Sequence, residues 1–216
     1  MEIFFDTEFT GLFKDTELIS IGLVTSRNNK FYAEINDFNN SNLDKWIKDN
    51  IISKLLYNDT DKTFIVKDNN ISMKDSKINV SRKLNEWLKQ VCPENENIQF
   101  VSDVSSYDFV LLVDLISGNS LDLPKNITPY CYDINQELAN KLNISNMEAF
   151  DLSREEFVKS NNIELGKENK HNSLFDAEII ACIYKILKLK WNIYYYGGKN
   201  RYLTTIFFIY LKYYKQ

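Results

Sequence analysis

Two carboxylates near the N-terminus are the first residues of the chain that could do chemistry. Asp6 and Glu8 follow the apolar run 3–5 and lie on a predicted strand. Because side chains alternate along a strand, both carboxylates leave the same face, roughly 7 Å apart along the chain. Acidic pairs are common and most are simply solvated, but a pair directly after an apolar run is less expected at the surface. Asp6 and Glu8 are therefore candidate ligands of one cation.

The same tripeptide, Asp-Thr-Glu, recurs nine residues later at positions 15–17. This second copy follows Lys14 in a polar link rather than an apolar run. We interpret it as the polar start of the second strand and assign it no catalytic role.

A histidine and an aspartate form the second candidate pair. His171, the only histidine, precedes Asp176 by five residues. A histidine just ahead of a helix and an aspartate in its first turn can face the same cleft; alternatively, Ser173 and Asp176 form a helix cap. Glu178 lies two residues further round the helix and should face elsewhere. Since the ordinary pKa of histidine is near neutral, His171 is the candidate general base.

A further aspartate stands in the middle of the chain. Asp108 begins an apolar helix directly after a strand, where sites form at the carboxyl ends of strands in α/β sheets. Its alternative role is to stabilise the helix dipole. Asp103, at the end of the preceding strand, is the nearest competitor and a candidate neighbour of the site.

These carboxylates would repel one another if they shared a cleft. Each close pair costs up to about 4 kcal/mol at an effective dielectric constant of about 20. Divalent cations remove this cost, and oxygen ligands favour Mg²⁺ or Mn²⁺ over zinc. The residues therefore predict a Mg²⁺ or Mn²⁺ site.

The periodicity of apolar residues predicts an α/β fold. Three β-rich runs, 2–9, 17–26 and 30–36, indicate an antiparallel meander. We expect one domain over residues 1–216 with a mixed five-stranded sheet, three strands antiparallel and then two parallel, and helices on both faces. After the meander we predict a helix from Ser41 to 56, with a capping-box-like Ser41/Asp44 pair, and then a surface loop at 57–77. Further helices are predicted at 80–91, 106–118, 135–143 and 153–162, and further strands at 98–104 and 127–134. A last helix begins at Asn172 and is ended by Gly197 and Gly198.

Composition limits the class of protein. The net charge of −4 argues against coating of long nucleic acid but not against gripping a few nucleotides at a strand end. Three widely spaced cysteines without a CxxC pair indicate reduced thiols in the cytoplasm. No signal peptide is expected, and the apolar run at 203–211 falls short of the roughly 20 residues that cross a bilayer. That run suggests core packing or self-association.

The order of three segments resembles the DEDD superfamily of 3′-5′ exonucleases. FFDTEF, SYDFVLL and HNSLFDA correspond to its three motifs, and the spacing of His171 and Asp176 resembles the DEDDh branch. The opening FFDTEFTGLFKDTELISIGLV, with KFYAEINDF and WIKDNIISKL, is similar to RNase AS-like and RNase T-like exoribonucleases over most of 1–190. Residues 191–216 form an aromatic, apolar extension outside that resemblance. Val104 replaces an Asn common in RNase T-like proteins and Ser173 replaces a commoner Ala, but neither departure removes a ligand.

The resemblance implies an RNase H-like fold and a metal-dependent reaction at RNA 3′ ends. Two divalent cations would be held by Asp6, Glu8 and Asp176 and by Asp6 and Asp108, the latter through water, with His171 as general base. The product would be a nucleoside 5′-monophosphate. An adenosine-leaning, single-stranded RNA substrate and a homodimer are also implied. The rival interpretations are an exonuclease on single-stranded DNA and an inactive nucleic-acid-binding protein with the same fold.

Residues beside the first motif are candidates for substrate binding. Phe9 and Leu12 could stack on the terminal base, although core packing explains them equally well. The backbone from Glu8 to Thr10 could read the ribose 2′-hydroxyl that distinguishes RNA from DNA. Phe9, Thr10 and Leu12 are therefore the predicted substrate contacts.

Overall fold

One mixed β-sheet forms the centre of the protein. The computed structural model describes residues 1–41, 43–57, 60–165 and 170–196, the last eight of these by backbone alone. Within them the sheet has seven strands in the order β4-β5-β3-β2-β1-β6-β7. The strands are β1 (Glu2–Phe9), β2 (Leu18–Thr25), β3 (Lys30–Ile35), β4 (Thr63–Lys67), β5 (Asn70–Asp75), β6 (Gln99–Ser102) and β7 (Tyr132–Asp133).

The predicted meander and the predicted parallel strands are confirmed. β1, β2 and β3 pair antiparallel, with Asp6 opposite Gly22 and Glu8 opposite Ser20. β6 pairs parallel to β1, and β7 pairs parallel to β6. β7 has only two residues, fewer than the predicted run at 127–134, because Ile127 forms just an isolated bridge with Ile98.

The predicted strand count of five was wrong, because residues 57–77 are not a surface loop. They contain the hairpin of β4 and β5, which pair antiparallel around a two-residue turn, and β5 joins the sheet parallel to β3. Asp68 occupies the turn with a φ of 55°. Branched and aromatic residues of TFIVK favour a strand, but the Asn, Asp and Lys around them conceal that signal.

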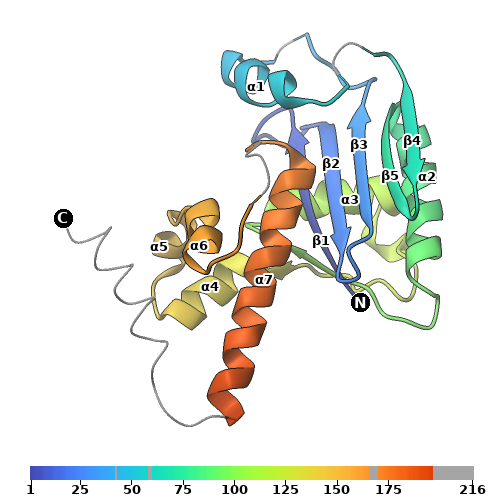
Figure 1. Ribbon diagram of the computed structural model, residues 1–216. Helices are drawn as coiled ribbons and strands as arrows, with labels where there is room; N and C mark the ends of the chain where they lie inside the picture. The colour runs from blue at the N-terminus through green and yellow to red at the C-terminus, as the bar shows by residue number, and fades with distance from the viewer. Residues whose placement is uncertain (42, 58–59, 166–169, 197–216) are drawn as a thin grey trace.

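Different helices cover the two faces of the sheet (Figure 1). α2 (Lys77–Val91) and α3 (Ser106–Ser117) pack on one face, and α7 (Ser173–Tyr196) crosses the other. β1 contributes to both cores because its side chains alternate: Ile3 is buried with α2 and α3, and Phe4 with α7. The same alternation directs Asp6 and Glu8 to the α7 face and Thr7 to the α3 face.

The remaining helices lie at the edges of these layers. α1 (Lys45–Asn50) begins after Asp44, whose side chain accepts from the Ile47 N–H, so Ser41 is not the cap. α3 ends at Gly118, which has the φ of 79° expected of a left-handed cap. α5 was not predicted, and Gly197 and Gly198 lie outside the described residues. The others are η1 (Ile52–Lys54), η2 (Ser120–Asp122), α4 (Ile134–Leu142), α5 (Asn146–Phe150) and α6 (Arg154–Ser160).

Among the described residues, no helix has the length and apolarity needed to span a membrane. The apolar run at 203–211 lies outside them.

Candidate active site

The end of β1 supplies the two carboxylates of the first motif. Asp6 is half-buried, and Glu8 is buried beside β2. The strand register is irregular between Glu8 and Phe9, immediately after the second carboxylate. Phe9 then packs against the core on the α3 side and stacks on Tyr107, with ring centroids 5.6 Å apart. The strand therefore ends its regular pairing directly after the two candidate ligands.

Thr7, between the two carboxylates, ties the middle motif to β1. Its backbone N–H and its hydroxyl both donate to Oδ1 of Asp108, over 3.1 and 2.6 Å. Asp108 lies in the first turn of α3 and is buried. These two hydrogen bonds hold the Asp108 carboxylate at the end of β1, next to Asp6. The side chain of Thr7 was not singled out from the sequence, although it stands inside the motif.

The start of α7 brings the third motif onto the same end of the sheet. Asn172 caps the helix by accepting from the Phe175 N–H, and the His171 N–H donates to Oδ2 of Asp176 over 3.0 Å. The alternative cap by Ser173 is therefore wrong; its hydroxyl bonds with that of Ser20. The helix approaches β2 closely because Gly22 has no side chain: a Cβ there would lie 2.3 Å from the backbone of the α7 residue Leu174.

Three of the predicted residues form a compact ligand cluster. One ligand atom from each of Glu8, His171 and Asp176 lies within 4.8 Å of the others. Asp6, His171 and Asp176 also line a cavity of about 260 Å³ together with residues of α6 and the loop before it. The structure thus brings all five predicted residues to one end of the sheet, with Asp108 placed by Thr7.

Burial and the charges of neighbouring carboxylates raise the pKa values of Asp6, Glu8, Asp108 and Asp176. Burial is the largest cause for each. Asp108 and Asp176 raise the pKa of Asp6 further, and Asp176 helps to raise the pKa of Glu8 to about 8. The pKa of Asp176 rises to about 7, although the hydrogen bond from the His171 N–H opposes the rise. Without a counterion, the site therefore takes up protons.

The donor set fits divalent cations. The raised pKa values mean that the four carboxylates do not all ionise readily, and a bound cation would favour their ionised form. Carboxylate oxygens are the ligands that Mg²⁺ and Mn²⁺ prefer. Glu8 and Asp176 bring carboxylate oxygens within 4.8 Å of each other and of His171, as ligands of one cation require, and Asp6 and Asp108 add two more carboxylates at this end of β1. Burial lowers the pKa of His171, and the charge of Lys170 lowers it further.

We expect the metal-free protein to lose stability as pH rises from about 4 to about 8. Folded carboxylates with raised pKa values bind more protons than unfolded ones in this window, so the free energy of unfolding falls as they ionise. Mg²⁺ or Mn²⁺ should flatten this fall and raise the melting temperature, most clearly near pH 8. Thermal melts across this pH range, with EDTA or with metal, measure both effects. A metal-free protein that grows more stable toward pH 8 would contradict the electrostatic picture.

Asp103 has a partner other than the cluster. The Arg154 guanidinium donates to both of its carboxylate oxygens, over 2.6 and 2.9 Å, and also to the backbone oxygens of Ala149 and Leu152. Asp103 thus forms an ion pair with Arg154, which holds the start of α6 at the cavity that Asp6 also lines. Sequence reasoning missed Arg154, because it meets Asp103 across 51 positions of the chain.

Trp46 on α1 is a second residue that sequence reasoning missed. Its ring meets the His171 ring edge to face, with centroids 5.2 Å apart, and its side chain is 54% exposed. An exposed tryptophan beside the predicted base offers a surface for a nucleobase as well as support for the imidazole.

The predicted substrate residues lie on the loop that follows β1. Phe9 packs against Tyr107, so its ring is already engaged within the protein. The Thr10 hydroxyl accepts from the Glu17 N–H and closes the loop. Leu12, in contrast, is 78% exposed. The second Asp-Thr-Glu tripeptide lies in this loop outside the cluster, as predicted, and Glu178 faces away to pair with Lys30.

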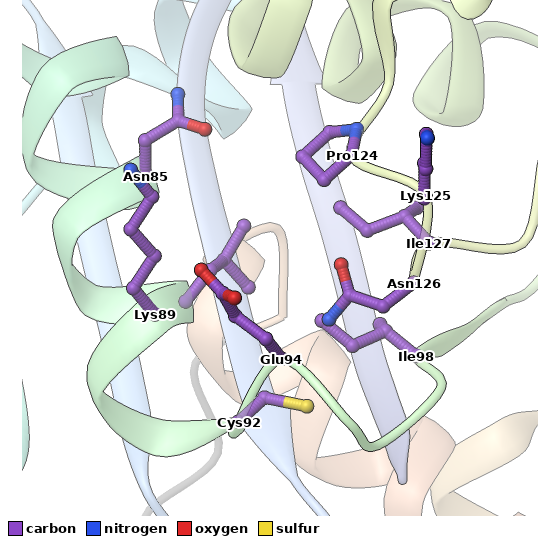
Figure 2. Close-up of a pocket in the computed structure, with 10 residues that line it drawn as sticks. Asn85, Lys89, Cys92, Glu94, Ile98, Pro124, Lys125, Asn126 and Ile127 are labelled. Carbon is purple, nitrogen blue, oxygen red and sulfur yellow. The ribbon is translucent and has the colours of Figure 1, made fainter.

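A larger cavity, of about 380 Å³, lies between the end of α2 and the segment before β7 (Figure 2). Glu94 is its only carboxylate, and burial raises the pKa of the Cys92 thiol that lines it. A protonated thiol is a poor nucleophile and a poor metal ligand. This cavity therefore lacks the acidic cluster found at the end of β1.

The comparison with protein families matches nearly the whole described chain. Residues 1–187 match the family described as the 3′-5′ exoribonuclease Rv2179c-like domain. The chain belongs to this family. No curated protein sequence matches it. Membership of the Rv2179c-like exoribonucleases confirms the resemblance to DEDD exonucleases and implies metal dependence, which the acidic cluster fits.

Solved structures show that the Rv2179c-like domain shares the DEDD exonuclease fold, which is RNase H-like. A 3′-exonuclease described in 3′-end-specific recognition of histone mRNA stem-loop matches with a TM-score of 0.60 at 15% identity, over 87% of this chain and 63% of that one. Cell-death related nuclease 4 (CRN-4) matches with a TM-score of 0.60 at 15% identity, over 88% and 64%. A full-length 3′-exonuclease matches with a TM-score of 0.59 at 14% identity, over 88% and 81%. The chain thus spans less than two thirds of the first two proteins.

Proposed function

We propose that the protein removes nucleoside 5′-monophosphates one at a time from single-stranded 3′ ends of RNA, using two Mg²⁺ or Mn²⁺ ions. The observation that carries this proposal is the meeting of Asp6, Glu8, Asp108, His171 and Asp176 at the end of β1. A cluster of four carboxylates is unfavourable without counterions, and bound cations would offset that cost. We therefore interpret the cluster as a cation site. Family membership supplies the reaction class.

The residues divide into metal ligands and a base. Divalent cations held by these carboxylates would supply activation of a water and stabilisation of the leaving 3′-oxygen. Glu8 and Asp176 lie together with His171, the Asp6 carboxylate is close enough to be repelled by both, and Thr7 holds Asp108 at the end of β1. His171 takes the proton of the water, because its lowered pKa leaves the imidazole neutral and able to accept at pH 7.

The site accommodates the 3′ end of a nucleic-acid chain better than an internal nucleotide. Its cavity is small, and α6 and the loop before it close one side. Trp46, exposed beside His171, and Leu12, exposed on the loop after β1, are apolar surfaces suited to contact the last bases. We assign Phe9 to the support of this loop and keep Thr10 and the backbone around it as the contact to the terminal ribose. A protein of net charge −4 grips such an end through its cations rather than through a broad basic surface.

RNA should be degraded faster than DNA of the same sequence, because a 2′-hydroxyl at the terminal ribose offers the backbone near Thr10 an additional hydrogen bond. Digestion of matched 5′-labelled RNA and DNA oligomers measures the ratio, and homopolymer RNAs test the proposed preference for adenosine. Duplexes with and without 3′ overhangs test the requirement for a single strand. Faster degradation of DNA would replace this substrate with single-stranded DNA.

We also propose a cytoplasmic homodimer in which residues 1–216 form one domain. The outermost strand, β4, supports self-association, since Phe64, Ile65 and Val66 are each half exposed on an unpaired edge. Two antiparallel copies centred on Ile65 would place Lys62 opposite the partner subunit's Asp68. Light scattering should give twice the monomer mass for the wild type and the monomer mass for Ile65→Lys.

A further inference from the structure

A buried carboxylate outside the acidic cluster lies near the end of β3. Glu34 is 0% exposed. Its Oε1 accepts three hydrogen bonds: from the Tyr32 hydroxyl over 2.8 Å, from the Leu56 N–H over 2.6 Å and from the Tyr57 N–H over 3.1 Å. Oε2 is buried and has no hydrogen-bond partner among the described residues. One oxygen of this carboxylate thus joins two separate segments of the chain.

The first of these segments is the turn that carries His171. The Tyr32 hydroxyl, itself fully buried, accepts from the side-chain amide of Asn172 over 3.4 Å. Asn172 directly follows His171 and caps α7 through the Phe175 N–H. Glu34 therefore reaches the backbone of His171 through Tyr32 and Asn172.

The second segment is the chain that follows α1. Leu56 and Tyr57 come two and three residues after η1, which continues from α1. Ile47 and Ile51 fasten α1 to the core at Ile19. The exposed ring of Trp46, on this helix, meets the His171 ring edge to face. The same buried oxygen thus bonds to the chain that follows α1 and, through Tyr32 and Asn172, reaches the turn of His171.

The burial of Glu34 calls for a reason other than stability. Removing a carboxylate from water costs free energy that hydrogen bonds offset only in part, and an apolar side chain of similar size often stabilises such a site more. A carboxylate oxygen can, however, accept from a hydroxyl and two backbone N–H groups at once, which an apolar side chain cannot. Such a residue specifies one arrangement of the segments around it.

We propose that Glu34, Tyr32 and Asn172 form a positioning network that holds His171 and Trp46 against each other at the rim of the active site. The expected effect of this network on catalysis rests on the proposed function. None of the three residues lines the catalytic cavity or belongs to the ligand cluster. They act through the residues that they place, so each is a positioning residue.

The single histidine provides a direct test of the arrangement. The imidazole Cε1–H gives one NMR signal, which the Trp46 ring shifts from its random-coil position while the two rings are in contact. Trp46→Leu defines the position of the signal without that ring. Tyr32→Phe removes the hydroxyl between Glu34 and Asn172 but keeps the bonds from the Leu56 and Tyr57 N–H groups, whereas Glu34→Leu removes the acceptor of all three bonds. We expect both variants to move the signal toward this position or broaden it. Glu34→Gln keeps an acceptor oxygen and should leave the signal close to that of the wild type.

Kinetics test whether the arrangement matters for the reaction. Tyr32→Phe should lower kcat on RNA about 10- to 100-fold with little change in KM, because displacement of a base by about 1 Å is enough for such a loss. Glu34→Gln should recover most of the wild-type kcat. Ile183→Val, on the buried face of α7, serves as a control that lowers stability at a residue outside the network.

Two results would overturn the proposal. One is a His171 signal that stays at its wild-type position in Tyr32→Phe and Glu34→Leu, measured well below their melting temperatures. The other is an unchanged kcat in Tyr32→Phe, or a loss no larger than that of Ile183→Val. A wild-type protein without nuclease activity would refute the proposed function instead, and the His171 signal would still decide whether the network positions this residue.

Discussion

Asp6→Asn is expected to abolish exonuclease activity and yet raise the melting temperature of the metal-free protein. Asp6 meets the repulsion of every other carboxylate of the cluster, and burial adds to its raised pKa. A neutral amide removes that repulsion and also removes the carboxylate that we propose as a ligand of both cations. A loss of about 4 kcal/mol of transition-state stabilisation corresponds to a fall in kcat of about 1000-fold. Single-turnover digestion of RNA and thermal melts in EDTA measure the two effects.

The second Asp-Thr-Glu tripeptide offers a matched control. Asp15→Asn makes the same substitution in the same local sequence, at an exposed position of the loop after β1. Activity, metal response and melting temperature should all stay at wild-type values. A fall in the metal-free melting temperature of Asp6→Asn would show that Asp6 has a supporting role in the fold and that repulsion is not the dominant effect. Equal losses of activity in both variants would remove the distinction between the two copies.

His171→Ala is expected to lower kcat about 100- to 10,000-fold while leaving the affinity for Mn²⁺ within a few-fold of wild type. The lowered pKa of His171 keeps the imidazole neutral at pH 7, which is the form that accepts a proton. Its ring also lies within ligand distance of Glu8 and Asp176, so metal binding must be measured separately. Digestion at saturating Mn²⁺ gives kcat, and a Mn²⁺ titration followed by thermal melts gives the affinity.

The loss of kcat and the loss of Mn²⁺ affinity in His171→Ala together show whether His171 is a base or a metal ligand. A base affects the chemical step alone, whereas a ligand affects the cations as well. Parallel losses of kcat and of Mn²⁺ affinity would make His171 a metal ligand or a structural residue. His171→Gln, which keeps a polar side chain at the start of α7, should show the same low kcat as His171→Ala.

The acidic site could be predicted from the sequence because its signals are local. Alternation on a strand places Asp6 and Glu8 together, and a helix start places Asp176 within reach of His171. Asp108 is different, because no local spacing relates it to the other four residues. Its position depends on the hydrogen bonds from Thr7, which join positions 101 residues apart. The family motifs identified it where spacing could not.

Other features depend on contacts that no local pattern reveals. The hairpin of β4 and β5 was mistaken for a loop because its strands are short and Asn, Asp and Lys surround them. Arg154 shows no periodicity that marks it as the partner of Asp103, and Trp46 reads as an ordinary exposed helix residue. The buried Glu34 likewise looks like any acidic residue of a polar strand end. Long-range geometry decides the roles of all three.

Digestion of a 5′-labelled single-stranded RNA tests the central claim most directly. With Mg²⁺ or Mn²⁺, the wild type should produce a ladder that shortens from the 3′ end and release nucleoside 5′-monophosphates. EDTA should stop the reaction, and Asp6→Asn protein purified in the same way should be inactive. Release of no nucleotide with either metal, or of internal fragments instead of mononucleotides, would contradict a metal-dependent 3′-5′ exoribonuclease.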